Sequence, residues 1–181
     1  AIERLRTIDT LIVDKTGTLT QGRPAFRQVV GHGGFSADEV LRLAASLDQG
    51  SAHPLADAIV TEARRRELKL SAATDFDSVT GLGVRGRVEG RAVAIGSKAL
   101  MLAVGADAGP LAGAAERLRD AGATAMFVAL DGHAVGMIAV ADPIKDTSLR
   151  TIQALQAMGV RVVMATGDGL STARAVAREL A

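Results

Sequence analysis

The chain has 181 residues, 48 % of them apolar, and a net charge of +1, so it is long enough for one or two domains with a sizeable core. It contains no cysteine, tryptophan or tyrosine, which excludes disulfides and thiolate metal sites and argues against an aromatic platform for nucleic acid. The small net charge favours neither nucleic acid nor an anionic membrane as a partner, and no apolar run approaches the roughly 20 residues that span a bilayer. Because the first residue is Ala1, we expect a piece of a longer protein.

The first predicted element is a strand over residues 8–13, where the run "LIV" is typical of a buried parallel strand. The strand ends at Asp14, and the sequence continues "KTGTLT". An acid at the end of a buried strand, followed by a lysine and a Thr-Gly-Thr turn, indicates a polar site at the edge of a sheet.

The middle of the chain has a different pattern, in which glycine-rich turns separate short strands. Ser36 and Glu39 form a capping box, Pro54 is a favoured first helical residue, and Asp131-Gly132 is a strong hairpin signal. The predicted elements are a helix over residues 39–48, a helix from residue 54, short strands over 81–97, a helix over 111–121 and two strands over 125–140. This pattern predicts an α+β unit with an antiparallel sheet.

The last part returns to alternating helix and strand. A helix over residues 146–158 precedes the apolar strand 160–165, and "ATGDG" then leads into a helix over 170–181. In open parallel sheets ligands bind beyond the carboxyl ends of the strands. If the first and last strands are neighbours, Asp14 and Asp168 converge on one crevice.

This crevice suits a phosphate group, because Thr16, Thr18, Thr166 and the glycine amides offer hydrogen-bond donors. Asp14 could then act as a nucleophile that forms an acyl phosphate, with Mg²⁺ neutralising the charge of the incoming phosphoryl group. The simpler alternative is that Asp14 caps a turn and Asp168 caps a helix. The complete run Asp-Lys-Thr-Gly-Thr-Leu-Thr favours the catalytic interpretation.

Six segments together resemble the motifs of P-type ATPases. "DKTGTLT" (14–20) is similar to the phosphorylation motif, "TGD" (166–168) to the second phosphate-binding motif, and "DPIK" (142–145) to the segment where the chain returns to the phosphorylation domain. "SAHPLADAI" from 51, "GLGV" from 81 and "AIGS" from 94 resemble signatures of the heavy-metal-transporting subgroup. The motifs follow the family order and cover essentially the whole chain.

The resemblance implies an α/β fold: an incomplete haloacid-dehalogenase-like (Rossmannoid) phosphorylation domain with an inserted α+β nucleotide-binding domain built on an antiparallel sheet. Residues 1–23 and 138–181 would form the two parts of the phosphorylation domain, and residues 24–137 the insert. Within the first domain, Asp14 corresponds to the phosphorylated aspartate, and Asp14 and Thr16 to the Mg²⁺ ligands. The residues expected around the phosphates are Lys15, Thr16, Thr166, Gly167 and Asp168.

Within the insert, the resemblance implies a binding site for ATP. His53 would orient the adenine, Asp48 would lie on the adenine side, and Gly81 and Gly83 would let the backbone approach ATP because a β-carbon would obstruct it. Gly96 matches the glycine of the third motif. Without their neighbours, His53 is equally well interpreted as a helix-start residue, and Gly81 and Gly83 as hairpin turns.

The sequence also departs from the family pattern. Ala52, Ser97 and Gly169 replace polar residues and Asp48 replaces a glutamate, so weaker nucleotide affinity is expected. A downstream lysine and a Mg²⁺-binding motif of the family are expected beyond Ala181, together with the membrane helices and the actuator domain. We therefore expect the chain to bind nucleotide but to lack full turnover by itself.

The function predicted from the sequence is the ATP-binding and phosphorylation region of a heavy-metal pump, copper-like, in a cytoplasmic domain of an integral membrane protein. The cofactors are ATP and Mg²⁺, the partners are the membrane and actuator domains of the same pump, and the transported metal binds elsewhere. One alternative is a phosphatase of the same superfamily, which needs a second acid two residues after the nucleophile, where Thr16 stands. The other is a nucleotide-binding module without turnover.

Overall fold

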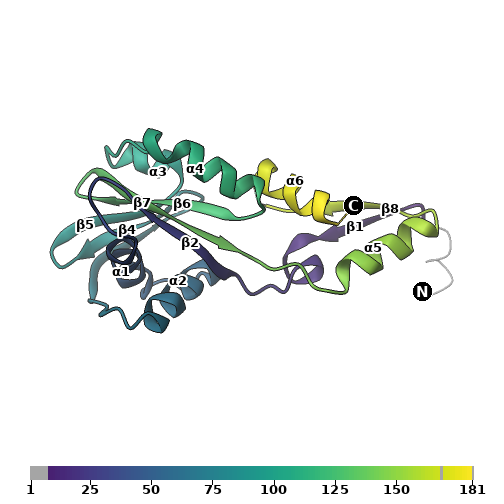
Figure 1. Cartoon of the computed structure of the whole chain (residues 1–181), viewed down its shortest axis with the longest axis horizontal. Helices are drawn as coiled ribbons and strands as arrows, with labels where there is room; N and C mark the ends of the chain where they lie inside the picture. The colour runs from purple at the N-terminus through teal and green to yellow at the C-terminus, as the bar shows by residue number, and fades with distance from the viewer. Residues whose placement is uncertain (1–7, 168, 181) are drawn as a thin grey trace.

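The structure is a computed structural model that describes residues 8–167 and 169–180. Its strands form two sheets: β1 and β8 pair in parallel, and a six-stranded antiparallel sheet has the order β2-β7-β6-β5-β4-β3. In Figure 1 the larger sheet with its helices lies at one end of an elongated molecule, and the strand pair lies at the other. The predicted fold, an α/β unit interrupted by an antiparallel α+β insert, is confirmed.

The strands are β1 (Thr10–Asp14), β2 (Ala25–Gly31), β3 (Ala73–Val79), β4 (Gly83–Val88), β5 (Arg91–Gly96), β6 (Thr124–Leu130), β7 (His133–Ala141) and β8 (Arg161–Ala165). The helices are α1 (Ala37–Asp48), α2 (Pro54–Arg65), α3 (Lys98–Ala103), α4 (Gly109–Asp120), α5 (Ser148–Ala157) and α6 (Leu170–Glu179). Three of these elements, β2, β3 and α3, were not predicted from the sequence.

The parallel pair brings together segments from the two ends of the chain, with Asp14 opposite Ala165. Side chains from the turn after β1 and from α5 and α6 pack on one face of this pair and form a small core. Among the described residues nothing covers the other face, where Ile12 is 69 % exposed and Val163 is 40 % exposed. The expectation of a buried strand is therefore wrong for one face of β1, because the described chain supplies helices to only one side.

The six-stranded sheet has a helical layer on each face. Helices α1 and α2 pack on one face, against side chains such as Val128 and Ile138. Helices α3 and α4 pack on the other, against Phe127 and Met137. Neighbouring residues of one strand thus enter different cores, as the twofold repeat of a strand requires.

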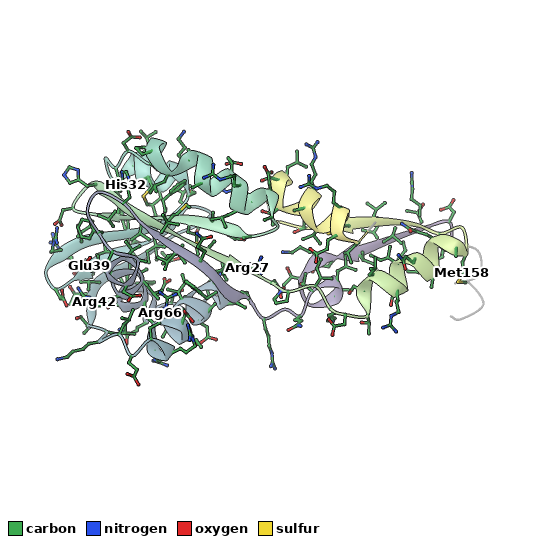
Figure 2. The ribbon with its side chains drawn as sticks, viewed as in Figure 1. Arg27, His32, Glu39, Arg42, Arg66 and Met158 are labelled. Carbon is green, nitrogen blue, oxygen red and sulfur yellow. The ribbon has the colours of Figure 1, made fainter. Side chains whose placement is uncertain are left out.

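Local signals that were predicted are present in the insert. Ser36 and Glu39 make the reciprocal bonds of a capping box before α1, and Pro54 opens α2. Asp131 and Gly132 both have positive φ, 48° and 78°, as a two-residue hairpin between β6 and β7 needs. Two ion pairs connect α1 to its neighbours. Arg42 of α1 pairs with Glu89, which follows β4, and Arg66 at the end of α2 pairs with Asp38 of α1; Figure 2 labels both arginines.

Two stretches of chain connect the strand pair to the larger sheet, and one carboxylate joins them. Asp142 accepts hydrogen bonds from the Thr20 hydroxyl (2.5 Å) and from the amides of Gly22 and Arg23 (3.1 Å each). The strand β7 pairs with β2 as far as Ala141, past the expected limit at residue 137. We therefore propose that the insert extends over about residues 24–141.

A second contact between the two parts comes from α6. The Thr172 hydroxyl donates to the carbonyl of Ala123 (3.3 Å), and Arg178 donates to the carbonyl of Asp120 (3.0 Å) at the end of α4. Figure 1 shows α6 following the end of α4 along the long axis of the molecule, whereas Met158, at the end of α5, lies at the far end (Figure 2). None of the helices in the described part of the chain is both long and apolar enough to cross a bilayer.

Candidate functional site

The first group of predicted site residues lies where β1 and β8 end. Because the parallel register places Asp14 beside Ala165, the turn after Asp14 and the segment from Thr166 leave the same edge of the sheet. Asp14 is exposed, whereas Lys15 is buried, with 7 % of its surface accessible. Thr16 and Gly167 are exposed and Thr166 is half-buried. Asp168 lies outside the described residues.

The turn that follows Asp14, Lys15–Leu19, is held in shape by its neighbours. Gly17 has a φ of 76°, a conformation that favours glycine. Its amide donates to the Thr20 hydroxyl (3.3 Å), and its carbonyl accepts from the Lys145 ammonium (2.5 Å). Ser148 at the start of α5 donates to the carbonyl of Leu19 (2.7 Å). The turn is therefore fixed to both connecting stretches, and the backbone beside Asp14 is preorganised.

The second group of predicted site residues surrounds one cavity in the insert, with a volume of about 540 Å³. All of the residues predicted for the nucleotide site line it: Asp48, His53, Gly81, Gly83 and Gly96. Hydroxyl groups line it as well, from Ser51, Ser78, Thr80, Ser97 and Thr124. The cavity thus gathers residues from α1, α2 and the ends of four strands.

Strand register shows which way this cavity faces. Gly83 begins β4 opposite Gly96, which ends β5, and Thr124 begins β6 opposite Val140 of β7. The chain enters β2 and leaves β7 at this same edge, since Ala25 pairs with Ala141. The cavity therefore lies at the end of the sheet where β4 and β6 begin and β5 and β7 end. From this same end of the sheet the chain continues toward Asp14.

Two side chains give the cavity its polarity on the α1–α2 side. Asp48 is the last residue of α1 and is only 6 % exposed, and no described group donates a hydrogen bond to its carboxyl. Burial raises the pKa of this carboxyl to about 7. His53 caps α2: its Nδ1 accepts from the amide of Leu55 (3.1 Å), which assigns the proton of the neutral ring to Nε2.

The glycines of the cavity have different reasons to be glycine. A β-carbon on Gly83 would lie 2.1 Å from the carbonyl oxygen of Ile95, and one on Gly96 would lie 2.1 Å from that of Leu82. Both glycines are therefore required by the close approach of β4 and β5 themselves. A β-carbon on Gly81 would meet nothing within 4 Å, but its φ of 73° favours glycine.

Comparisons with known proteins show the family to which the chain belongs. A family model described as haloacid dehalogenase-like hydrolase matches residues 8–181. The chain belongs to the haloacid dehalogenase-like hydrolases. It is 47 % identical over 180 residues to "Copper-transporting ATPase 1" of Rhizobium meliloti. The matched segment covers 99 % of this chain and 22 % of that protein. The chain thus spans about a fifth of the length of the curated relatives it matches.

Solved structures extend the likeness to three dimensions. A zinc-transporting PIB-type ATPase in its E2.Pi state superposes with a TM-score of 0.75 at 36 % identity, over 99 % of this hydrolase chain and 29 % of that one. The catalytic domain of the CPx-ATPase CopB-B, described with conformational changes upon nucleotide binding, gives a TM-score of 0.70 at 25 % identity, over 98 % of this chain and 60 % of that one. The chain therefore resembles the phosphorylation and nucleotide-binding region of copper-type P-type ATPases.

Among the described cavity residues that sequence reasoning missed, Arg119 is the one with a basic side chain. Arg119, in the last turn of α4, lines the cavity from the side opposite α1 and α2. The sequence shows only a basic residue near a helix C-terminus, where one is common. Within residues 8–167 and 169–180, no three histidine or acidic side chains gather in a way that could hold a metal ion.

Proposed function

We propose that this chain is the ATP-binding and aspartyl-phosphorylation region of a heavy-metal-transporting, copper-type P-type ATPase, located in the cytoplasm. The observation that carries the proposal is the convergence of all predicted nucleotide residues on one cavity, at the sheet edge that faces the strand ending in Asp14. The chain spans 22 % of the length of its copper-transporting relative. We therefore propose, and do not observe, that the whole protein transports a heavy metal and that this chain works with membrane and actuator domains of the same pump.

In the cavity, the base of ATP is held between α1 and the start of α2. The Nε2 proton of His53 can donate to a base nitrogen, and the Asp48 carboxyl can pair with a polar edge of the base. We propose that these two contacts favour adenine over other bases. The phosphates then extend toward the edge where the chain leaves the sheet.

At the other site, a carboxylate oxygen of Asp14 attacks the γ-phosphorus of ATP. A carboxyl–phosphorus bond forms, the bond from that phosphorus to the bridging oxygen breaks, and ADP leaves with the released electron pair. The preorganised turn Lys15–Leu19, with Lys15 and Thr16, stabilises the arriving charge. The two parts of the molecule must close for this step, and closure excludes water.

The donors at this edge fit Mg²⁺, which binds through one or two carboxylates together with phosphate oxygens and water. Asp14 and the backbone carbonyl of Thr16 would hold the ion, which neutralises phosphate charge when bound.

A phosphatase of the same superfamily is the second candidate. Such enzymes use an acid two residues after the nucleophile to activate water, and here that position holds Thr16 in an extended conformation (φ −75°, ψ 124°). Because a threonine cannot act as this base, the acyl phosphate should persist, which suits a pump better than a phosphatase. A nucleotide-binding module without turnover is the third candidate.

Calorimetric titration with ATP tests the nucleotide site. His53→Ala should weaken binding on the order of tenfold, because its hydrogen bond to the base is lost, whereas Asp14→Asn should bind as the parent does. Equal affinity of His53→Ala and the parent would remove His53 from the site. In a longer protein that contains this chain, labelled ATP should yield an acid-stable, hydroxylamine-sensitive phosphoenzyme. Its survival in Asp14→Asn would exclude the proposed nucleophile.

A further inference from the structure

Arg119 is the only lysine or arginine among the described residues that line the cavity. It lies in the last turn of α4, directly before the segment that leads into β6. The side chains of Asp48 and His53 approach the cavity from the other helical layer, on α1 and α2. A ligand that fills the cavity is therefore in contact with a carboxyl and an imidazole on one side and a guanidinium on the other.

The guanidinium of Arg119 is held in place by three neighbours. Its Nη2 donates to the carbonyl of Ala125 (2.9 Å), and its Cζ atom lies over the ring of Phe127, 5.6 Å from the centroid. Its Nη1 donates to Glu116 one turn earlier (2.6 Å). A guanidinium fixed by backbone and ring pays little further conformational entropy when it binds a ligand.

The contact with Glu116 is the one that a ligand can replace. Glu116 has 60 % of its side chain exposed and Arg119 has 23 %, and ion pairs that solvent reaches contribute little free energy. A phosphate offers the guanidinium a matching pair of oxygens with more charge than a carboxylate. Glu116 thus keeps the guanidinium satisfied until an anion arrives.

The position of Arg119 indicates which part of a nucleotide it meets. Arg119 precedes Thr124, at the edge of the sheet where β7 leaves toward the strand pair, and Asp48 and His53 lie on the opposite helical layer. With the base against Asp48 and His53, as in the function proposed above on which this inference rests, the phosphates extend along this edge. We propose that Arg119 binds the polyphosphate of the nucleotide and that Glu116 competes with it for the guanidinium.

Calorimetry on the 181-residue chain, with ATP and adenosine as separate ligands at fixed ionic strength, tests this assignment. Arg119→Gln should weaken ATP binding on the order of tenfold and leave adenosine binding unchanged. Glu116→Gln should strengthen ATP binding about twofold, because the competing carboxylate is gone. Arg117→Gln is the matched control: this exposed side chain lies two positions away, carries the same charge and does not line the cavity.

The outcomes separate this inference from the proposed function. If the parent binds ATP and Arg119→Gln binds it equally well, Arg119 is not a phosphate ligand, although the nucleotide site stands. An equal loss of ATP and adenosine in Arg119→Gln would mean that the residue only supports the fold of the cavity. If Arg117→Gln weakened ATP binding as much as Arg119→Gln does, the effect would come from the net positive charge of the chain and not from a contact of Arg119 with the phosphates. A parent that binds neither ligand overturns both proposals.

Discussion

Replacing Asp48 with asparagine should stabilise the protein at neutral and basic pH. The carboxyl of Asp48 is buried at the end of α1, no described group donates a hydrogen bond to it, and its pKa is raised from 3.8 to about 7. An amide of the same shape carries no charge at any pH. Asp48→Asn therefore removes the cost of burying a carboxylate without leaving a cavity.

The size and sign of the effect follow from proton linkage. Between pH 3.8 and about 7 the native state keeps the Asp48 proton that the unfolded state has lost, so the parent loses stability as pH rises through this window. Each pH unit costs about 1.4 kcal/mol. Relative to the parent, Asp48→Asn should gain up to about 4 kcal/mol above pH 7, and this gain should vanish near pH 4.

Urea unfolding followed by circular dichroism at pH 5, 6.5 and 8 measures this gain, since the chain lacks tryptophan and tyrosine for fluorescence. Asp57→Asn, which makes the same change at an exposed position in the first turn of α2, is the control, and the stabilisation that grows with pH should be specific to Asp48→Asn. A gain that does not grow between pH 5 and 8 would refute the reasoning. So would an asparagine variant less stable than the parent at pH 8.

Two further predictions concern stability, and urea unfolding measures both. Gly83→Ala should destabilise the protein by more than about 2 kcal/mol, because the new β-carbon would lie 2.1 Å from the Ile95 carbonyl oxygen. Gly81→Ala should cost only about 1 kcal/mol, because this position has open space and only its positive φ disfavours alanine; equal losses in the two variants would contradict this explanation. Asp142→Ala removes a carboxylate that accepts three hydrogen bonds and should lower stability by about 2 kcal/mol. Asp142→Asn, which keeps one acceptor, should lose less in the same urea unfolding series, and an identical loss would argue against the hydrogen bonds.

Local chemistry made part of the fold predictable from the sequence. The pair Asp131-Gly132 can adopt the positive φ values of a tight hairpin, and Ser36 with Glu39 satisfies the first amides of α1, so both features depend on a few neighbouring residues. The pairing of β1 and β8 entered the sequence reasoning as the condition under which Asp14 and Asp168 would converge, and the parallel register of the two strands meets that condition.

Features set by long-range packing were not predictable. The strand β3, "ATDFDSV", lies at the edge of the sheet with most of its side chains exposed, so its composition lacks the apolar pattern of a strand. The strand β2 contains an irregularity between Phe26 and Gln28 that breaks its alternation. Arg119 reaches the cavity only because α4 packs on the sheet, and its sequence neighbours carry no sign of this.

The joint at Asp142 has a consequence for how the first domain tolerates so large an insert. Thr20 pairs with Ile144, so the insert leaves and returns at adjacent points. If the connection of about 120 residues were unstructured, pairing β1 with β8 would cost about 3 kcal/mol more in loop-closure entropy than it would with a four-residue turn. This estimate takes about 0.6 kcal/mol for each doubling of loop length. Once the insert has folded, its ends are already together, and β1 and β8 can pair as if a short turn joined their halves.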